Sequence, residues 1–222
     1  MRQMASVGMY KSASVVAPGA FRAFSCTPAI LLCSLTLLVV GCQRMMPLDT
    51  KPLDNVGMSY SAIKQLQALD ITSAELAEVA KARAAGFPDD SCIEMVRIYH
   101  SRKLPFGAGD TVAGLVKAHL RGDTILQLAK LDELGINAEG LELIRLAGFS
   151  DSMVLEVASH EAAGKPVFSG ATLSSMKNAG MREPVLLELV RRNIPDSEAP
   201  AIIGLHRHGA RDADILRRYT GA

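Results

Sequence analysis

The chain has 222 residues, enough for one or two domains, and its 24 Lys and Arg nearly balance its 23 Asp and Glu. Without the three basic residues that precede Cys42, 21 basic and 23 acidic residues leave a formal charge of −2. Proteins that bind nucleic acid or acidic lipid by charge carry a basic excess, so we expect neither kind of partner here.

The segment 1–41 is predicted to be an export signal. Basic residues precede an apolar run from Ala29 to Gly41, and no acidic residue occurs before position 43. A membrane-spanning helix needs about 20 apolar residues, so this shorter run favours a cleaved signal over a permanent anchor. Translation starting at Met1, Met4 or Met9 is compatible with this organisation.

A short motif closes the apolar run. Val39-Val40-Gly41-Cys42 resembles the lipobox of bacterial lipoproteins, although that family prefers Leu where Val39 stands. The resemblance implies a lipid on the Cys42 sulfur, cleavage just before that residue, and acylation of the new N-terminus. Several acyl chains, at about 0.8 kcal/mol per buried methylene, hold a protein durably on a bilayer.

The residue after the motif bears on the location. In the lipoprotein family an Asp there favours the inner membrane, so Gln43 favours the outer membrane and its periplasmic face, with the inner membrane as an alternative. The other interpretations of the run are an ordinary signal peptide with a chance cysteine and a buried apolar helix.

Cysteine usage agrees with this processing. Cleavage before Cys42 removes Cys26 and Cys33, lipid occupies Cys42, and Cys92 alone remains. The mature chain therefore has no intrachain disulfide even in an oxidising compartment. We expect Cys92 to be a small buried apolar residue rather than a reactive thiol, because no histidine pattern accompanies it.

Residues 42–57 are predicted to form the lipidated N-terminus and a flexible tether, because they contain two Pro, a Gly and no regular periodicity. Residues 58–222 show apolar residues at helical spacing throughout, and no alternating pattern typical of strands. We expect short helices, separated by Gly, Pro and capping residues, within 59–70, 71–86, 88–102, 109–120, 122–135, 137–148, 150–164, 170–180, 182–193, 195–209 and 211–219.

The helical region contains an internal repeat. AGFPD at positions 85–89 returns as AGFSD at positions 147–151. In the two 62-residue blocks that these motifs begin, 85–146 and 147–208, seven of the first 22 positions are identical without a gap. We predict an all-α, solenoid-like array of tandem short helical hairpins. Each block supplies about four short helices, a half unit precedes the first block, and a third unit begins after the second.

The repeated pentapeptide predicts a corner between two helices. Gly148 ends one helix because glycine adopts the left-handed conformation without steric cost. Ser150 caps the next helix, and Asp151 suits the positive end of its dipole. Phe149 and Val154 have the spacing of a hydrophobic staple.

The first copy of the corner differs at one position. Gly86 and Phe87 are expected to act as Gly148 and Phe149 do, but Pro88 has no capping side chain, so Asp89 is expected to cap the helix. Gly180 and Gly209 are predicted to be further corners of the repeat. Phe106 and Phe168, a second pair at equivalent positions of the two blocks, are expected to be large side chains of the core.

Motifs for catalysis or cofactor binding are scarce. His206-Arg207-His208 places two histidines on different sides of a helix, so we expect no metal site there. The sequence has no P-loop, HExxH or paired CxxC, and we expect no cofactor. Residues 107–113, GAGDTVA, resemble the hairpin of the helix-hairpin-helix DNA-binding family, which implies backbone amides facing a phosphate. The second block has Ser169-Gly170-Ala171 at that place and lacks the G-x-G.

Three hypotheses of function follow. The first is a non-catalytic interaction or scaffold module, anchored to the membrane by lipid, that binds another protein of the bacterial envelope. The second is an envelope enzyme acting on a cell-wall glycan or peptide, for which paired acids such as Glu94 and Asp123 would be needed. The third is nucleic-acid binding through the G-x-G turn.

Overall fold

The computed structural model describes residues 48–135 and 138–219. The predicted signal peptide, the alternative start sites, Cys42 and Gln43 lie outside these residues. Within the described ranges the chain forms twelve α-helices and one short 3-10 helix, and it contains no β-strand. The prediction of an all-α helical array is therefore confirmed.

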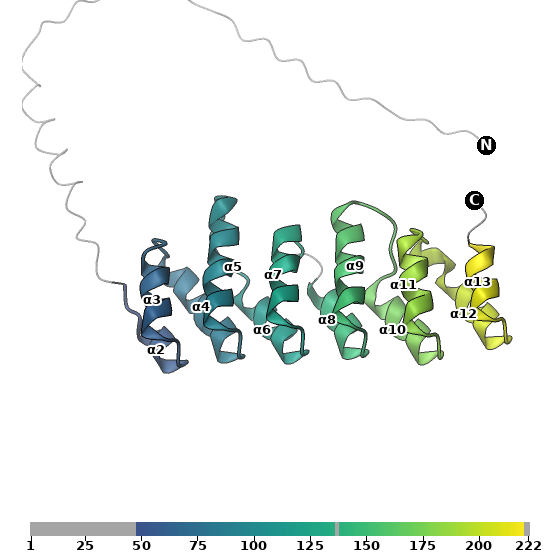
Figure 1. The fold of residues 1–222 in the computed structure, drawn as a ribbon, viewed down its shortest axis with the longest axis horizontal. Helices are drawn as coiled ribbons and strands as arrows, with labels where there is room; N and C mark the ends of the chain where they lie inside the picture. The colour runs from purple at the N-terminus through teal and green to yellow at the C-terminus, as the bar shows by residue number, and fades with distance from the viewer. Residues whose placement is uncertain (1–47, 136–137, 220–222) are drawn as a thin grey trace, which may run out of the picture. The chain divides into compact units, whose positions relative to one another are not determined.

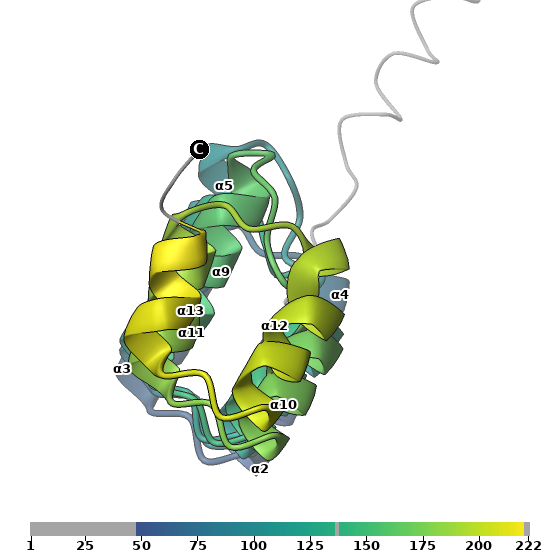
Figure 2. The ribbon, with the colours of Figure 1, turned by 90° about the vertical axis from the view of Figure 1, so that its right-hand side faces the viewer.

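The helices alternate between two layers. In chain order they are α2 (Lys51–Asn55), α3 (Tyr60–Gln67), α4 (Ser73–Ala84), α5 (Asp89–Ser101), α6 (Gly109–Lys117), α7 (Gly122–Leu131), α8 (Ala138–Leu146), α9 (Asp151–Ala162), α10 (Gly170–Asn178), α11 (Glu183–Arg191), α12 (Ala199–Arg207) and α13 (Asp212–Arg218). Each even-numbered helix packs against the next even-numbered one, and each odd-numbered helix against the next odd-numbered one. Figure 2 shows the two layers end-on, with α12 in one and α13 in the other.

The structural repeat is a single hairpin: an even-numbered helix, a tight corner, and the following odd-numbered helix (Figure 1). One residue with positive φ marks each corner: Gly57, Gly86, His119, Gly148, Gly180 and Gly209. Shorter and longer steps alternate between successive corners, so two hairpins together closely restore the 62-residue period of the sequence. The predicted unit of four helices is therefore a pair of hairpins, and its boundary at residue 85 falls inside the hairpin of α4 and α5.

The corners form as the pentapeptide predicts. The φ angles of Gly86, Gly148, Gly180 and Gly209 are +100°, +81°, +94° and +81°. Ser150 caps α9 by accepting a hydrogen bond from the Met153 N–H at 3.4 Å. The corner at His119 lies between the helices expected within 109–120 and 122–135. It was not predicted as a repeat corner, because it has His119 at a φ of 63° in place of the glycine of the other corners.

The prediction that Asp89 caps its own helix is wrong. No side chain caps α5. The Asp89 carboxylate instead accepts the N–H of Ser59, the N-cap residue of α3 in the preceding hairpin, at 2.9 Å. In the same way, Glu183 at the start of α11 accepts the N–H of Ser150, the N-cap of α9, at 3.0 Å. An acidic residue at the start of one odd-numbered helix thus binds the N-cap of the previous one.

This connection between hairpins is missing at α5 for a chemical reason. Its N-cap is Pro88, which has no N–H to donate. In addition, the first residue of the next odd-numbered helix is Gly122, which has no carboxylate to accept such an N–H. Asp123, the second residue, accepts the adjacent Thr124 N–H at 2.9 Å and pairs with Arg121 at 3.4 Å. One hairpin later the connection returns, because Asp151 accepts the Arg121 N–H at 3.2 Å.

The predicted tether is wrong from Lys51 onward. Residues 51–55 form α2, which packs against α4, and Leu53 is only 1% exposed. Pro52 is compatible with this helix because it occupies the first turn, where its missing N–H has no partner to lose. No periodicity revealed α2 in the sequence, because the helix is too short to display a full amphipathic pattern.

The core contains the aromatic residues that the repeat predicts. Phe87, Phe149, Phe106 and Phe168 are all at most 2% exposed, as expected. Cys92 is also buried, and burial raises the pKa of its thiol to about 12. The neutral thiol is a poor nucleophile, so the structure agrees with a packing role for this residue.

The last hairpin has a polar outer side. The residue after each corner is large and buried in the first five hairpins: Met58, Phe87, Leu120, Phe149 and Met181. After the sixth corner it is Ala210. Helix α13 has the exposed residues Asp214 and Arg218 at its third and seventh positions, where α9 has the buried Met153 and Val157. Polar outer faces are typical of terminal repeats in stacked arrays.

Candidate functional site

The G-x-G motif at 107–109 serves helix packing. Gly109 is the first residue of α6, and a Cβ at this position would lie 2.3 Å from the Glu78 carbonyl oxygen of α4. Its N–H donates to the Glu78 carboxylate at 2.8 Å. Gly170, at the start of α10, makes the same close approach to the Gly140 carbonyl of α8, also at 2.3 Å. The amide that the helix-hairpin-helix resemblance assigned to a phosphate is therefore occupied within the fold.

The two acids suggested for an enzyme each pair with an arginine. Glu94 of α5 forms an ion pair with Arg97 of its own helix at 3.8 Å. Asp123, at the start of α7, pairs with Arg121. Two carboxylates that share a hydrolytic site would face one substrate between them. Here each carboxylate faces a guanidinium.

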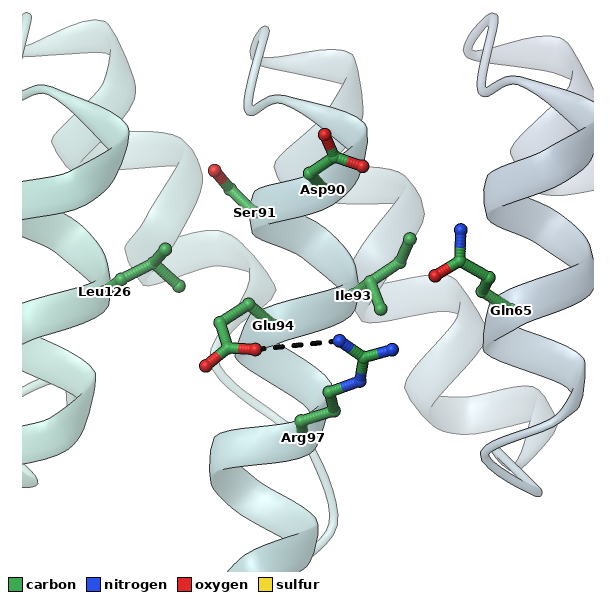
Figure 3. A pocket seen from close by; sticks show the side chains of 7 residues that line it. All are labelled: Gln65, Asp90, Ser91, Ile93, Glu94, Arg97 and Leu126. Carbon is green, nitrogen blue, oxygen red and sulfur yellow. Dashed lines mark ion pairs between the residues drawn. The ribbon is translucent and has the colours of Figure 1, made fainter.

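Glu94 and Arg97 line a hollow on the outer face of the odd-numbered layer (Figure 3). The hollow has a volume of about 380 Å³ and is bordered by α3, α5 and α7. Its lining residues are Gln65, Asp90, Ser91, Ile93, Glu94, Arg97 and Leu126. Figure 3 shows Gln65 and Leu126 reaching in from the two neighbouring helices, with the ion pair between them.

The hollow belongs to a row of equivalent residues. The fifth residue of each odd-numbered helix from α5 to α13 is aliphatic: Ile93, Leu126, Leu155, Leu187 and Leu216. Ile93 is buried, and the four leucines are partly buried. The sixth residue is long and polar: Glu94, Gln127, Glu156, Glu188 and Arg217. Each odd-numbered helix from α5 to α13 therefore has a long polar side chain beside an aliphatic one, which is buried in α5 and partly buried in the others. We call these residues the odd-layer row.

The histidines predicted not to bind metal lie on the last even-numbered helix and just beyond it. A Cβ added to the corner residue Gly180 would lie 3.4 Å from the His206 Nε2, so this ring packs beneath the corner. His208 follows the end of α12 and is exposed. Among the described residues no three or more His, Cys, Asp and Glu side chains are grouped to hold a metal ion.

A buried carboxylate was not foreseen as part of any site. Glu75 in the first turn of α4 is 3% exposed. It accepts hydrogen bonds from the Thr72 N–H at 2.9 Å, the Thr72 Oγ1 at 2.9 Å, the Phe106 N–H at 3.0 Å and the His100 Nε2 at 2.7 Å. Burial raises its pKa, but these hydrogen bonds outweigh burial and hold the pKa at about 2.

This arrangement makes Glu75 a structural connector. Its carboxylate joins the start of α4, the end of α5 and the loop that leads to Phe106. A carboxylate with a pKa near 2 stays ionised at neutral pH and is unsuited to general-acid catalysis. One signal in the sequence pointed to its local role, because Thr72-x-x-Glu75 is a capping box. Its distant partners His100 and Phe106 depend on the tertiary structure.

Within the described residues no helix is both long and apolar enough to cross a membrane. No family model, no curated protein and no solved structure matches this chain.

Proposed function

We propose that this protein is a lipid-anchored interaction or scaffold module of the bacterial envelope. In this proposal Cys42 carries the lipid, the outer membrane holds the anchor at its periplasmic face, and the hairpin array binds another envelope protein without catalysis or a cofactor. The support for the anchor is the lipobox resemblance of residues 39–42. The support for binding is the odd-layer row on the surface of the array.

The odd-layer row is the observation that carries the binding proposal. Stacked hairpins present equivalent side chains side by side, and repeat proteins use such extended surfaces to bind partners. The row repeats an aliphatic and a long polar residue across α5, α7, α9, α11 and α13. Interfaces combine apolar contacts with polar surroundings in this way.

The two other hypotheses have weaker support. An enzyme acting on a cell-wall glycan or peptide needs an acid and a base facing one substrate, whereas Glu94 and Asp123 each pair with an arginine. Nucleic-acid binding needs a free amide at the G-x-G turn, whereas the Gly109 N–H donates to Glu78.

Labelling with a fatty-acid probe in the producing bacterium tests the anchor. Replacement of Cys42 by Ala should abolish labelling and leave an unprocessed precursor, because the Cys42 sulfur is the proposed attachment atom. Cys92→Ala is the matched control and should label normally. Labelling that survives Cys42→Ala would refute the lipoprotein proposal.

Site-specific photocrosslinking in intact cells tests the binding surface. A photoreactive residue at Gln127, on the odd-layer row, should give a discrete protein adduct that persists after dilution of the cells. The same residue at Lys117, an exposed position of the even-numbered layer, is the control and should not give that adduct. Identical adducts from both positions, or none from positions 127, 156 and 188, would contradict the proposed surface.

A further inference from the structure

A second hollow lies at the edge of the array, where the first two hairpins meet. It has a volume of about 410 Å³, within the range of small-molecule sites. The residues that line it come from the end of α3, the start of α4, the end of α5 and the loop before α6: Leu69, Asp70, Glu75, His100, Lys103, Leu104 and Pro105. It is separate from the odd-layer row and does not depend on the proposed function.

The second block provides an internal comparison for this hollow. The connection from α5 to α6 contains Lys103 at a φ of 60°, and the corresponding connection from α9 to α10 contains Gly164 at 64°. Glycine adopts this left-handed conformation freely, whereas a residue with a Cβ is strained there. The first block therefore places a lysine side chain where the other described connections from an odd- to an even-numbered helix have Asp, Asn or Gly, which tolerate positive φ better. Such local strain is characteristic of functional positions.

Leu104, the next residue, is also unusual, because its large apolar side chain is exposed. Leu104 is 46% exposed, and large aliphatic side chains that exposed are few among the described residues. The corresponding position of the second block is Lys165, a residue suited to solvent. Leu69 and Pro105 continue the apolar side of the hollow.

The polar side of the hollow contains one acidic and one basic side chain that do not form an ion pair with each other. Within the described part of the chain, neither Asp70 nor Lys103 forms a side-chain ion pair or hydrogen bond. Glu75 already accepts four hydrogen bonds, and one of them fixes the His100 ring. An anionic and a cationic group therefore line the same hollow together with its apolar residues.

We infer that this hollow binds a short zwitterionic peptide with apolar side chains. The carboxylate of Asp70 receives the peptide's terminal ammonium, the ammonium of Lys103 receives its terminal carboxylate, and Leu69, Leu104 and Pro105 contact its side chains. Charge-assisted hydrogen bonds at both ends give orientation, and the apolar wall excludes water from the side chains.

Isothermal titration of the full-length protein in detergent micelles with the dipeptide Leu-Leu tests the inference. We expect saturable binding with one site per chain. N-acetyl-Leu-Leu lacks the ammonium and Leu-Leu amide lacks the terminal carboxylate, and each should bind about tenfold more weakly. Absence of saturable binding, or equal affinities for the three peptides, would overturn the inference.

Variants assign each end of the peptide to a residue. Lys103→Gly, which relieves the backbone strain, should weaken Leu-Leu about tenfold and leave Leu-Leu amide unchanged. Asp70→Asn should weaken Leu-Leu about tenfold and leave N-acetyl-Leu-Leu unchanged, because Asn also tolerates positive φ. Lys165→Ala, in the corresponding loop of the second block, is the control. The assignment would be overturned if Lys165→Ala lost affinity for Leu-Leu, or if neither Lys103→Gly nor Asp70→Asn did.

Discussion

The two 62-residue blocks use the same elements in the same order but differ at a few positions. Helices α5 to α8 of the first block correspond to α9 to α12 of the second. The corner glycines, the phenylalanines that follow them and the second pair of phenylalanines occur in both. The differences include Pro88 against Ser150 and, at the positive-φ residue of the connections that follow α5 and α9, Lys103 against Gly164. These two differences lie at a helix cap and in the loop beside a hollow.

The packing of the even-numbered helices is consistent with a sequence that repeats every two hairpins. Glycine begins α6 and α10, and alanine begins α8 and α12. Contact is more extensive between α4 and α6, and between α8 and α10, than between α6 and α8 or between α10 and α12. Closely and loosely packed hairpins therefore alternate, which agrees with the 62-residue period.

The largest expected effect tests whether the blocks share one packing. Phe149→Ala and Phe87→Ala should each lower the free energy of unfolding by about 3–5 kcal/mol, because each ring is fully buried after a corner. Ala210→Ser, at the same position of the last hairpin, should change it by less than about 0.5 kcal/mol. Urea unfolding followed by circular dichroism measures all three. A large loss for only one of the two phenylalanines would break the equivalence of the blocks.

The next effect concerns Glu75. Its folded-state pKa of about 2 lies below the ordinary value of 4.5, so the ionised carboxylate stabilises the fold above pH 4.5, and this contribution is lost as the pH falls toward 2. The shift corresponds to about 3 kcal/mol at neutral pH. Glu75→Gln should remove most of this contribution and flatten the dependence of stability on pH in that window.

Asp151 provides the comparison for that experiment. Burial raises its pKa, but hydrogen bonds from Thr124 and Arg121 and the charge of Arg145 lower it below the ordinary value. Asp151→Asn should therefore also weaken the dependence of stability on acid, but less than Glu75→Gln does. Urea unfolding at several pH values across the acidic range separates the two. An unchanged pH profile for Glu75→Gln would contradict the connector role of Glu75.

A third prediction concerns Gly109 and Gly170, where the first residue of one even-numbered helix lies close to the backbone of the preceding one. Gly109→Ala and Gly170→Ala should each destabilise the fold by about 1–3 kcal/mol, because the added Cβ would collide with a backbone carbonyl of the preceding even-numbered helix. Gly107→Ala is the matched control, since no atom lies within 4 Å of its added Cβ. Thermal melting of the three variants checks this. Equal melting temperatures for Gly107→Ala and Gly109→Ala would show that α4 and α6 are not this close.

The smallest expected effect concerns the missing connection at Pro88. Pro88→Ser supplies the N–H, and Gly122→Asp supplies a carboxylate at the position from which Asp151 accepts the N–H of Arg121. Gly122→Asp should then be about 0.5–1 kcal/mol more favourable in the Pro88→Ser background than in the natural chain. A double-mutant cycle measures this difference. A coupling energy near zero would show that the connection needs more than a donor at the N-cap.

Local chemistry allowed the sequence to predict the hairpin fold. Corner glycines, the Ser150 cap and the apolar periodicity act between residues a few positions apart, so their effect is visible in the sequence. The 62-residue period was visible for the same reason, although it concealed the single-hairpin repeat because successive hairpins differ in length. Helix α2 escaped detection, since it is too short for periodicity. The helix break near His119 was expected, but it was not recognised as a repeat corner, since it lacks glycine.

Only the tertiary structure decided which distant groups meet. Glu75 reaches His100 on the other helix of its own hairpin and Phe106 in the loop that follows, and Asp89 binds the N–H of Ser59 in the preceding hairpin. The sequence suggested instead that Asp89 caps its own helix. Such contacts depend on how hairpins stack, and the stacking results from the summed burial of apolar faces along the array. No local pattern encodes which N–H a given carboxylate will reach, so the connections between hairpins and the charges that line the two hollows emerged only from the packed structure.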